Sequence, residues 1–374
     1  MSRGLGDVYK RQKYMQINGS RDIREILKQG LAGTYDRNLY DRIRKNWDKV
    51  AKPLDSMGRF EDLTAKVGAI QGRIDPAFEK SAILVFCADN GIVEEHVSQS
   101  GQEVTAICAE NIAAGRTAVG VMAAMIRADV AAVNVGIANP VSDAVLPFCV
   151  RKGTRNFLKE PAMTGEEVYQ AMQTGMDLVL AWKQKGYQLL GIGEMGIGNT
   201  TTSAAMAAVM LGLSADTVTG KGAGLDEQGL THKKEVIEQA LLRYGLRETD
   251  TFTILQTVGG LDIAAMAGAV IGGAVYHMPI VLDGVISLVA ALVAERLLPN
   301  VRDFLIPSHR SKEPAAEKIS EKLRLDPVID AKMAVGEGTG AVMMLTLLKQ
   351  AALVYQSCNS FEAAGVEQYE RYTK

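Results

Sequence analysis

A glycine-rich stretch with one carboxylate, residues 191–203 (GIGEMGIGNTTTS), carries the clearest chemical signal in the chain. Glycines alternate there with apolar residues, and Glu194 lies among them. Glycine lets backbone N–H groups approach a ligand closely, and a helix N-terminus adds unpaired donors and a positive dipole end that favour a phosphate. An apolar run at residues 187–190 precedes the stretch. We therefore predict a strand, a glycine loop and a helix N-terminus that together form a phosphate site.

A second glycine-rich loop, at residues 336–340 (GEGTG), also encloses a carboxylate, Glu337. A helix is expected directly after it, over residues 341–356. An acid in this place could be a first-turn residue that complements the helix dipole. It could equally be a general base that takes a proton from a substrate at the mouth of an active site. The spacing alone leaves both interpretations open.

The glycines at 191, 193 and 196 also match the GxGxxG fingerprint of dinucleotide-binding loops. Asp216 lies about twenty residues further on, where the ribose-binding acid of such folds stands. That acid must end a second strand, but residues 204–213 belong to the expected helix, and Glu194 would repel a pyrophosphate. An NAD-dependent oxidoreductase is therefore only the alternative function. A P-loop is less favoured still, because Gly222, rather than Ser or Thr, follows Lys221.

Composition and the remaining reactive side chains argue against several function classes. The net charge of −2 disfavours a nucleic-acid-binding surface. The histidines and cysteines show no metal-ligand spacing, so we expect no metal and no cofactor. No Gly-x-Ser-x-Gly motif supports a serine hydrolase. Scattered cysteines are typical of reducing compartments, and we expect a cytoplasmic protein.

Two stretches could be mistaken for membrane or targeting segments. Residues 263–282 carry no Asp, Glu, Lys or Arg, but they are rich in glycine and alanine and contain His277 and Pro279. We interpret them as a buried helix to about residue 276 and a core strand at 279–282, with no membrane span. Residues 1–12 lack the apolar region of a signal peptide and resemble a translated sequencing adapter, so we expect a non-native leader.

Apolar runs that alternate with helical patterns predict the fold class. Strands are expected at residues 82–88, 129–137, 187–190, 279–282 and 302–306, with helices between them. This alternation predicts an α/β fold, a mostly parallel sheet with helices on both faces. Ligands of such sheets bind beyond the carboxyl ends of the strands, where most of the glycine and acidic clusters fall. Residues 21–70 are expected to form polar helices outside the sheet.

These motifs together resemble the nicotinate-nucleotide–dimethylbenzimidazole phosphoribosyltransferase family, over about residues 21–358. The glycine stretch with its threonines is the most specific of them. Supporting motifs lie in order at residues 52–61 (KPLDSMGRFE), 88–93 (ADNGIV), 102–105 (QEVT), 222–226 (GAGLD), 259–266 (GGLDIAAM), 282–284 (LDG), 308–314 (SHRSKEP) and 336–340 (GEGTG). The chain departs from the family pattern at Asp55, where a glycine-like residue is usual, and at Ala315 and Ala316, where Gly-His is common.

The resemblance implies transfer of the 5-phosphoribosyl group of nicotinate mononucleotide to 5,6-dimethylbenzimidazole or a related base. The products would be α-ribazole 5′-phosphate and nicotinate, with inversion at C1′. The family assigns the removal of the benzimidazole proton to Glu337, and Glu194 would face a ribose hydroxyl or support that proton. The implied nucleotide- and phosphate-binding residues are Gly193, Met195, Gly196, Ile197, Gly198, Asn199, Thr200, Lys221, Gly222 and Lys233. Those implied for base binding are Asp89, Ser98 and Gln102.

The resemblance also implies a division into two domains and a homodimer. A Rossmann-like catalytic domain would span residues 76–344, and residues 13–75 with about 345–374 would form a small helical domain. The partner's small domain would help to close each active site. The expected partners are the two small-molecule substrates, with no nucleic acid and no membrane. A non-catalytic sensor of azoles or nucleotides stays open as a third class, because a fold alone does not separate binding from catalysis.

Overall fold

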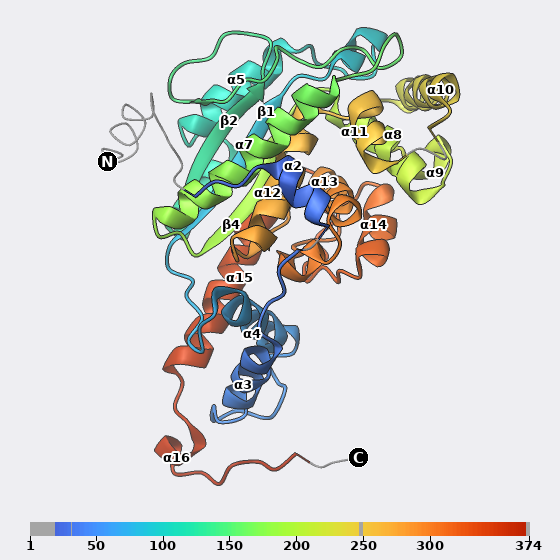
Figure 1. Ribbon diagram of the computed structural model, residues 1–374. Helices are drawn as coiled ribbons and strands as arrows, with labels where there is room; N and C mark the ends of the chain where they lie inside the picture. Colours follow the sequence, from blue (N-terminus) through green and yellow to red (C-terminus); the bar gives the residue numbers. More distant parts are fainter. Residues whose placement is uncertain (1–18, 31, 247–249, 372–374) are drawn as a thin grey trace.

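The computed structural model describes residues 19–30, 32–246 and 250–371 (Figure 1). The expected leader at residues 1–12 therefore lies outside the described residues. The helices of eight or more residues are α3 (Arg37–Trp47), α4 (Arg59–Gln71), α5 (Glu103–Ala113), α6 (Ala118–Met125), α7 (Gly165–Gln184), α8 (Asn199–Leu211), α10 (Glu227–Tyr244), α11 (Thr251–Val258), α12 (Leu261–Val275), α13 (Val285–Leu297), α14 (Ala315–Leu323) and α15 (Thr339–Ser357). Shorter helical turns are α2 (Ile23–Gln29), η2 (Gly91–Glu95), α9 (Ala215–Val218), η4 (Val301–Phe304) and α16 (Phe361–Ala364).

A parallel sheet forms the centre of the molecule. Its strands are β1 (Ser81–Ala88), β2 (Asp129–Gly136), β3 (Leu146–Pro147), β4 (Leu189–Met195), β5 (Ile280–Val281) and β6 (Leu305–Ile306). They lie in the order β3-β2-β1-β4-β5-β6, and every neighbouring pair is parallel. This is the doubly wound order, in which the chain switches direction between β1 and β4 and leaves a crevice beyond their carboxyl ends. The predicted α/β fold with a mostly parallel sheet is confirmed.

Strand β1 explains why the central strands read as continuous apolar runs. Leu84 and Phe86 pack into one core with α7, α8, α12 and α13, whereas Ile83 and Val85 pack into a second core with α5, α6 and α15. Every residue of β1 is buried. Helices therefore cover both faces of the sheet, and alternate residues of a strand serve two different cores.

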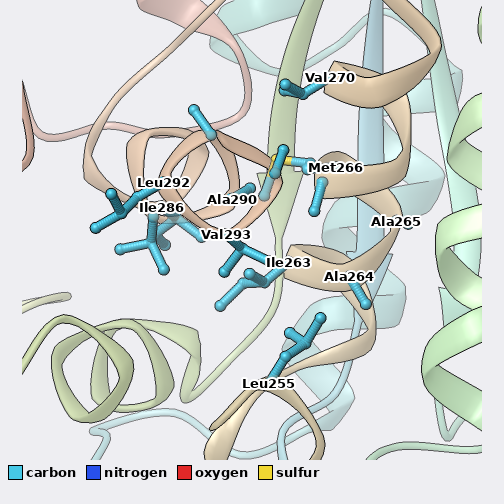
Figure 2. Close-up of a cluster of buried hydrophobic side chains, with 14 of the residues drawn as sticks. Leu255, Ile263, Ala264, Ala265, Met266, Val270, Ile286, Ala290, Leu292 and Val293 are labelled. Atoms are coloured by element: carbon cyan, nitrogen blue, oxygen red, sulfur yellow. The ribbon is translucent and has the colours of Figure 1, made fainter. Parts of the chain in front are cut away.

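The glycine- and alanine-rich stretch that could be mistaken for a membrane span is the buried helix α12 followed by β5, as predicted. Figure 2 shows apolar side chains of α11, α12 and α13, such as Leu255, Met266 and Leu292, gathered in one cluster. A Cβ at Gly268 would lie 1.8 Å from the backbone oxygen of Met172, so glycine lets α12 cross α7 closely. No helix in the described part of the chain is long and apolar enough to cross a membrane.

The helical end of the molecule combines α3 and α4 with the C-terminal part of the described chain, whereas α2 packs on α7. Figure 1 shows α3 and α4 below the sheet, beside the far end of α15 and the short α16. Val50 forms a β-bridge with Ser360, and Arg371 pairs with Asp48 at 2.7 Å and with Asp55 at 2.8 Å. Helix α15 runs unbroken from the sheet into this end, so the domain boundaries near residues 75 and 345 stay a prediction.

Two predicted strands differ from the observed ones. Strand β4 extends through Gly191, Gly193 and Glu194 to Met195, so much of the expected glycine loop is strand. The reason is packing, because two glycines in this strand let neighbouring groups approach more closely than a side chain would allow. The expected strand at 302–306 is mostly the 3-10 turn η4, and only residues 305–306 pair with β5. Helices α9, α11, α14 and α16 and strand β3 were not anticipated.

Candidate active site

The predicted site residues gather beyond the carboxyl ends of β1, β4 and β5. Asp89 directly follows β1, and Glu194 and Met195 end β4. The loop with Glu337 opens α15, which packs on the sheet beside β4. The site therefore occupies the crevice where the strand order reverses, the usual ligand position in doubly wound folds.

The two glycine motifs are in direct contact, although they lie far apart in the sequence. The backbone N–H of Glu337 donates a hydrogen bond to the carbonyl oxygen of Glu194, 3.3 Å away. A Cβ at Gly193 would lie 2.3 Å from the nitrogen of Gly338, so only glycine fits at this point of β4. The contact brings the carboxyl-bearing residues Glu194 and Glu337 together, as the motifs alone could not show.

Glu194 shares an amide with a second carboxyl group. The side-chain nitrogen of Asn199 donates to Glu194 and also to Oδ2 of Asp262, which lies 2.9 Å away. Burial raises the pKa of Glu194 to about 8, and the nearby Asp262, Asp283 and Glu337 raise it further against the lowering effect of Asn199. Burial also raises the pKa of Asp262 to about 6. Glu194 is thus mostly protonated at neutral pH.

Glu337 has a strained backbone and an unpaired carboxylate oxygen. Its φ is 61°, in the left-handed region that non-glycine residues rarely adopt. Its Oε2 is buried but forms no hydrogen bond within the described residues. Buried polar atoms are nearly always bonded, so an unpaired one needs an explanation. A carboxylate oxygen left free beside Glu194 is suited to take a proton from a bound molecule.

The start of α8 and a buried lysine lie on one side of the site. Residues 196–200 line a small hollow of about 50 Å³ together with Ser98 and Lys221. Lys233 is only 1% exposed and donates to Oγ1 of Thr200 at 2.9 Å. Burial lowers the pKa of Lys233 to about 8. Lys233 thus places an amino group, most of it charged at neutral pH, beside the helix N-terminus, where an anion is favoured.

Lys221 and Gly222 lie near the same hollow, whereas Gly193 and Met195 belong to β4. Lys221 is half exposed and pairs with Glu227 at 2.5 Å, so it stands at the rim. Gly222 has a φ of 55°, and a Cβ there would lie 2.6 Å from Oγ1 of Thr200. The second glycine loop therefore closes over the start of α8. A Cβ at Gly196 would lie 2.4 Å from the oxygen of Ala88, so this glycine serves the packing of the loop.

The three residues predicted to bind the base lie in different places. Asp89 is fully buried, and its Oδ2 accepts the backbone N–H of Ala138 at 2.8 Å, whereas its Oδ1 is buried without a hydrogen bond within the described residues. Ser98 lines the hollow at the start of α8. Gln102 donates to the oxygen of Asn90 at 3.4 Å and lines a separate polar hollow of about 300 Å³. The base-binding roles of these residues stay a prediction.

Several residues of the site were given no role in the sequence analysis. Asp262 shares Asn199 with Glu194, and Asn90 accepts a hydrogen bond from Thr202 at 2.8 Å. Thr105 accepts the backbone N–H of Ile197 at 3.1 Å and so holds the glycine loop. Asp262 and Thr105 lie in motifs that the sequence analysis quoted, and acidic residues at helix starts were the available signal.

The dinucleotide alternative is not supported by the position of Asp216. This residue lies in the short helix α9 after α8, not at the end of a strand, and pairs with Lys234 at 2.5 Å. The ribose-binding acid of a dinucleotide fold must end the second strand of the motif. Within the described ranges, no group of three His, Cys, Asp or Glu side chains is arranged to hold a metal ion.

Comparisons with known proteins place the site in a wider context. Residues 33–366 match a family model described as phosphoribosyltransferase. A nicotinate-nucleotide–dimethylbenzimidazole phosphoribosyltransferase of Acetivibrio thermocellus is 39% identical over 88% of this chain and 94% of its own length. The enzyme of the same name from Ruminiclostridium cellulolyticum is 40% identical, again over 88% of this chain and 94% of its own length. A crystal structure of CobT from Thermus thermophilus is similar with a TM-score of 0.84 and 35% identity, covering 89% of this chain and 100% of that one.

Proposed function

This chain belongs to the nicotinate-nucleotide–dimethylbenzimidazole phosphoribosyltransferase family, and we propose from that premise how its site works. The chain moves the 5-phosphoribosyl group of nicotinate mononucleotide to 5,6-dimethylbenzimidazole or a related base. The products are α-ribazole 5′-phosphate and nicotinate. The observation that carries the role of the site is the unpaired Oε2 of Glu337, held beside Glu194 by two glycine motifs in contact.

The chemistry requires one base. Nicotinate leaves from a pyridinium, so it takes the electrons of the broken C1′–N bond and needs no proton. A nitrogen lone pair of the benzimidazole forms the new bond to C1′ from the opposite side, which inverts that carbon. The proton on the second benzimidazole nitrogen must then be lost. The free carboxylate oxygen of Glu337 is suited to accept it.

Glu194 has a different role from Glu337 in this proposal. A carboxyl group with a pKa raised to about 8 keeps its proton at neutral pH and cannot accept another. It can donate a hydrogen bond, for which a ribose hydroxyl is a fitting acceptor. Its backbone oxygen meanwhile accepts the N–H of Glu337. Glu194 therefore orients the sugar and holds the base loop.

The phosphate of nicotinate mononucleotide binds at the start of α8. The helix N-terminus offers backbone N–H groups and the positive end of the dipole. Lys233 adds a buried amino group beside Thr200, and Lys221 adds an exposed cation at the rim. Residues 196–200, 221, 222 and 233 thus act on the nucleotide side, whereas Gly193 makes room for the Glu337 loop.

A second copy of the chain is the fitting partner for an apolar part of the surface. Ile107 of α5, Val121 and Met125 of α6 and Leu353 of α15 are each more than half exposed. Exposed apolar side chains that gather on neighbouring helices often mark an interface. We expect light scattering to give twice the chain mass, and the double variant V121E/M125E to shift it to one chain mass. A single chain mass for the unaltered protein would contradict the dimer.

Substitution of Glu337 tests the proposed base. E337Q keeps the shape of the side chain but cannot accept the proton, so kcat should fall about 10²–10⁴-fold while the KM for nicotinate mononucleotide changes little. E317Q is the control for loss of an acid that only complements a helix dipole, because Glu317 is exposed in the first turn of α14. Nicotinate release and α-ribazole 5′-phosphate formation are both measured by chromatography. Unchanged turnover in E337Q would show that Glu337 is not the base. If the unaltered protein binds both substrates but releases no nicotinate, a non-catalytic sensor is favoured instead.

A further inference from the structure

We propose that Asp283 is a positioning residue that sets the place of the Glu337 carboxylate through two backbone hydrogen bonds. The inference rests on the proposed role of Glu337 as the base. Asp283 follows β5 and lies on the inner side of the Glu337 loop, where it is only 3% exposed. It is therefore shielded from solvent and acts on the reaction only through the residues that it holds.

The carboxylate of Asp283 binds the backbone directly after Glu337, at Gly338 and Gly340. Its Oδ2 accepts the N–H of Gly338 at 2.9 Å, and its Oδ1 accepts the N–H of Gly340 at 2.7 Å. Burial raises the pKa of the Asp283 carboxyl, while His309 and the backbone N–H groups of Gly338 and Gly340 oppose that rise. Both bonds fall on the first residues of α15, directly after Glu337. Movement of Asp283 would thus move the backbone that carries the base.

Asp283 is itself fixed to the sheet. Its backbone N–H donates to Oγ of Ser287, and its carbonyl oxygen accepts Oγ of Ser308, both at 2.9 Å. The ring of His309 packs against the same carboxylate, with Nε2 3.9 Å from Oδ1 of Asp283. A Cβ at Gly340 would lie 2.2 Å from Cδ2 of this ring, so the histidine closes the remaining space. The carboxylate therefore has little freedom to shift.

The Glu337 loop needs such an anchor because its backbone is strained. Gly336, Glu337 and Gly338 have φ values of 82°, 61° and 89°, all in the left-handed region. A non-glycine residue stays there only when its surroundings hold it. On the β4 side, the carbonyl oxygen of Glu194 accepts the N–H of Glu337, and the absence of a Cβ at Gly193 lets the loop lie close to the strand. Asp283 and β4 together fix the loop between them.

The substitution D283N tests this role. Asparagine has nearly the same shape but loses the charge and one acceptor, so one of the two loop hydrogen bonds is lost. We expect kcat to fall about 10–100-fold, since a displacement on the order of 1 Å can cost that much. The KM for nicotinate mononucleotide should stay within about threefold, because the start of α8 binds that substrate. A kcat within about twofold of the unaltered enzyme would refute the inference.

A double-mutant cycle separates positioning from general stability. If Asp283 acts through Glu337, D283N should lower kcat by less than about twofold in an E337Q background. If the kcat losses of the two substitutions instead multiply in the double variant, Asp283 acts independently of the base, and the proposal is overturned. If E337Q alone keeps its turnover, the proposed base fails. If E337Q loses turnover and D283N does not, only the positioning role fails.

A matched variant controls for the removal of any buried carboxylate. Glu61 of α4 is 0% exposed and is bound by Arg44 and Lys52, outside the Glu337 loop. E61Q should lower the melting temperature and leave kcat within about threefold at a temperature where the protein is folded. Equal kcat losses in E61Q and D283N would refute a specific role. If D283N does not fold, S287A offers a milder test, with a loss of kcat of about threefold or more expected and an unchanged kcat refuting the proposal.

Discussion

The substitution G193A should misplace the carboxylate of Glu337, the proposed base, without altering that residue. A Cβ at residue 193 would lie 2.3 Å from the nitrogen of Gly338 and 2.6 Å from the carbonyl carbon of Glu337. Real Cβ contacts essentially never fall below 3.0 Å, and ordinary contacts begin near 3.4 Å. The Glu337 loop must therefore retreat by about 0.7–1.1 Å from its 2.3 Å approach, because the atoms it meets belong to the backbone and cannot turn away.

The size of the effect follows from this retreat. A misplacement on the order of 1 Å can lower the rate about 10²-fold, which corresponds to about 2.7 kcal/mol in the activation free energy. Overpacking should also lower the free energy of unfolding by about 1–3 kcal/mol. The expected result for G193A is a folded protein with a kcat about 100-fold lower and a nearly unchanged KM for nicotinate mononucleotide. Steady-state nicotinate release, followed by chromatography, measures both constants.

The neighbouring substitution G191A is the matched control. It lies in the same strand, and the three nearest atoms to a Cβ there belong to side chains, with Cδ1 of Ile83 at 2.3 Å and Cβ of Ala341 at 2.9 Å, rather than to the backbone of the Glu337 loop. G191A should lower the free energy of unfolding by a similar amount but leave kcat within about threefold. The reasoning is refuted if G193A keeps its kcat, or if both variants lose it equally. In the second case, general loosening of β4 would explain the loss.

Two further predictions concern the phosphate side and the acidic side of the site. K233M should raise the Kd of nicotinate mononucleotide about 10–100-fold, because a hydrogen bond to a charged group contributes about 1.5–3 kcal/mol, and titration calorimetry measures this. K234M, which removes a lysine paired with exposed Asp216, is the control, and equal affinities in the two variants would exclude Lys233 from phosphate binding. The free energy of unfolding should fall as pH rises from about 5 to about 8, by up to about 1.4 kcal/mol per pH unit. The reason is that the pKa of Glu194 is raised to about 8 in the folded chain, which therefore keeps a proton that the unfolded chain loses. E194Q should flatten this slope in urea denaturation, and an unchanged slope would count against a protonated Glu194.

The sequence predicted the fold well where its signals were local. Buried parallel strands read as apolar runs, so β1 and β2 were placed correctly to within about a residue. Helix α15, expected over residues 341–356, was placed within about two residues, since its apolar spacing is a local signal. Strand β3 and the helices α11 and α14 carried no such signal and were missed. Their formation depends on neighbours that are distant in the sequence.

The glycine stretch shows where local reading failed. Four glycines in eight residues were interpreted as a loop, because isolated strands rarely contain so many. In the fold, Gly191 and Gly193 belong to β4 and make room for Ile83 and for the Glu337 loop. The contact partners lie far along the chain, so no window around residue 193 could contain them. The phosphate-binding prediction concerns the part that is a loop and helix start, residues 196–200.

The sequence by itself determined the parallel α/β architecture and the family, and it predicted two carboxylates for the site, because each depends on residue types at short spacing. Only the tertiary structure decided how those carboxylates differ. Burial and three acidic neighbours keep the proton on Glu194, whereas Glu337 has an unpaired oxygen on a strained loop. The structure also placed Asp283 beneath that loop. Distances and burial between distant segments set these properties, and a linear sequence does not contain them.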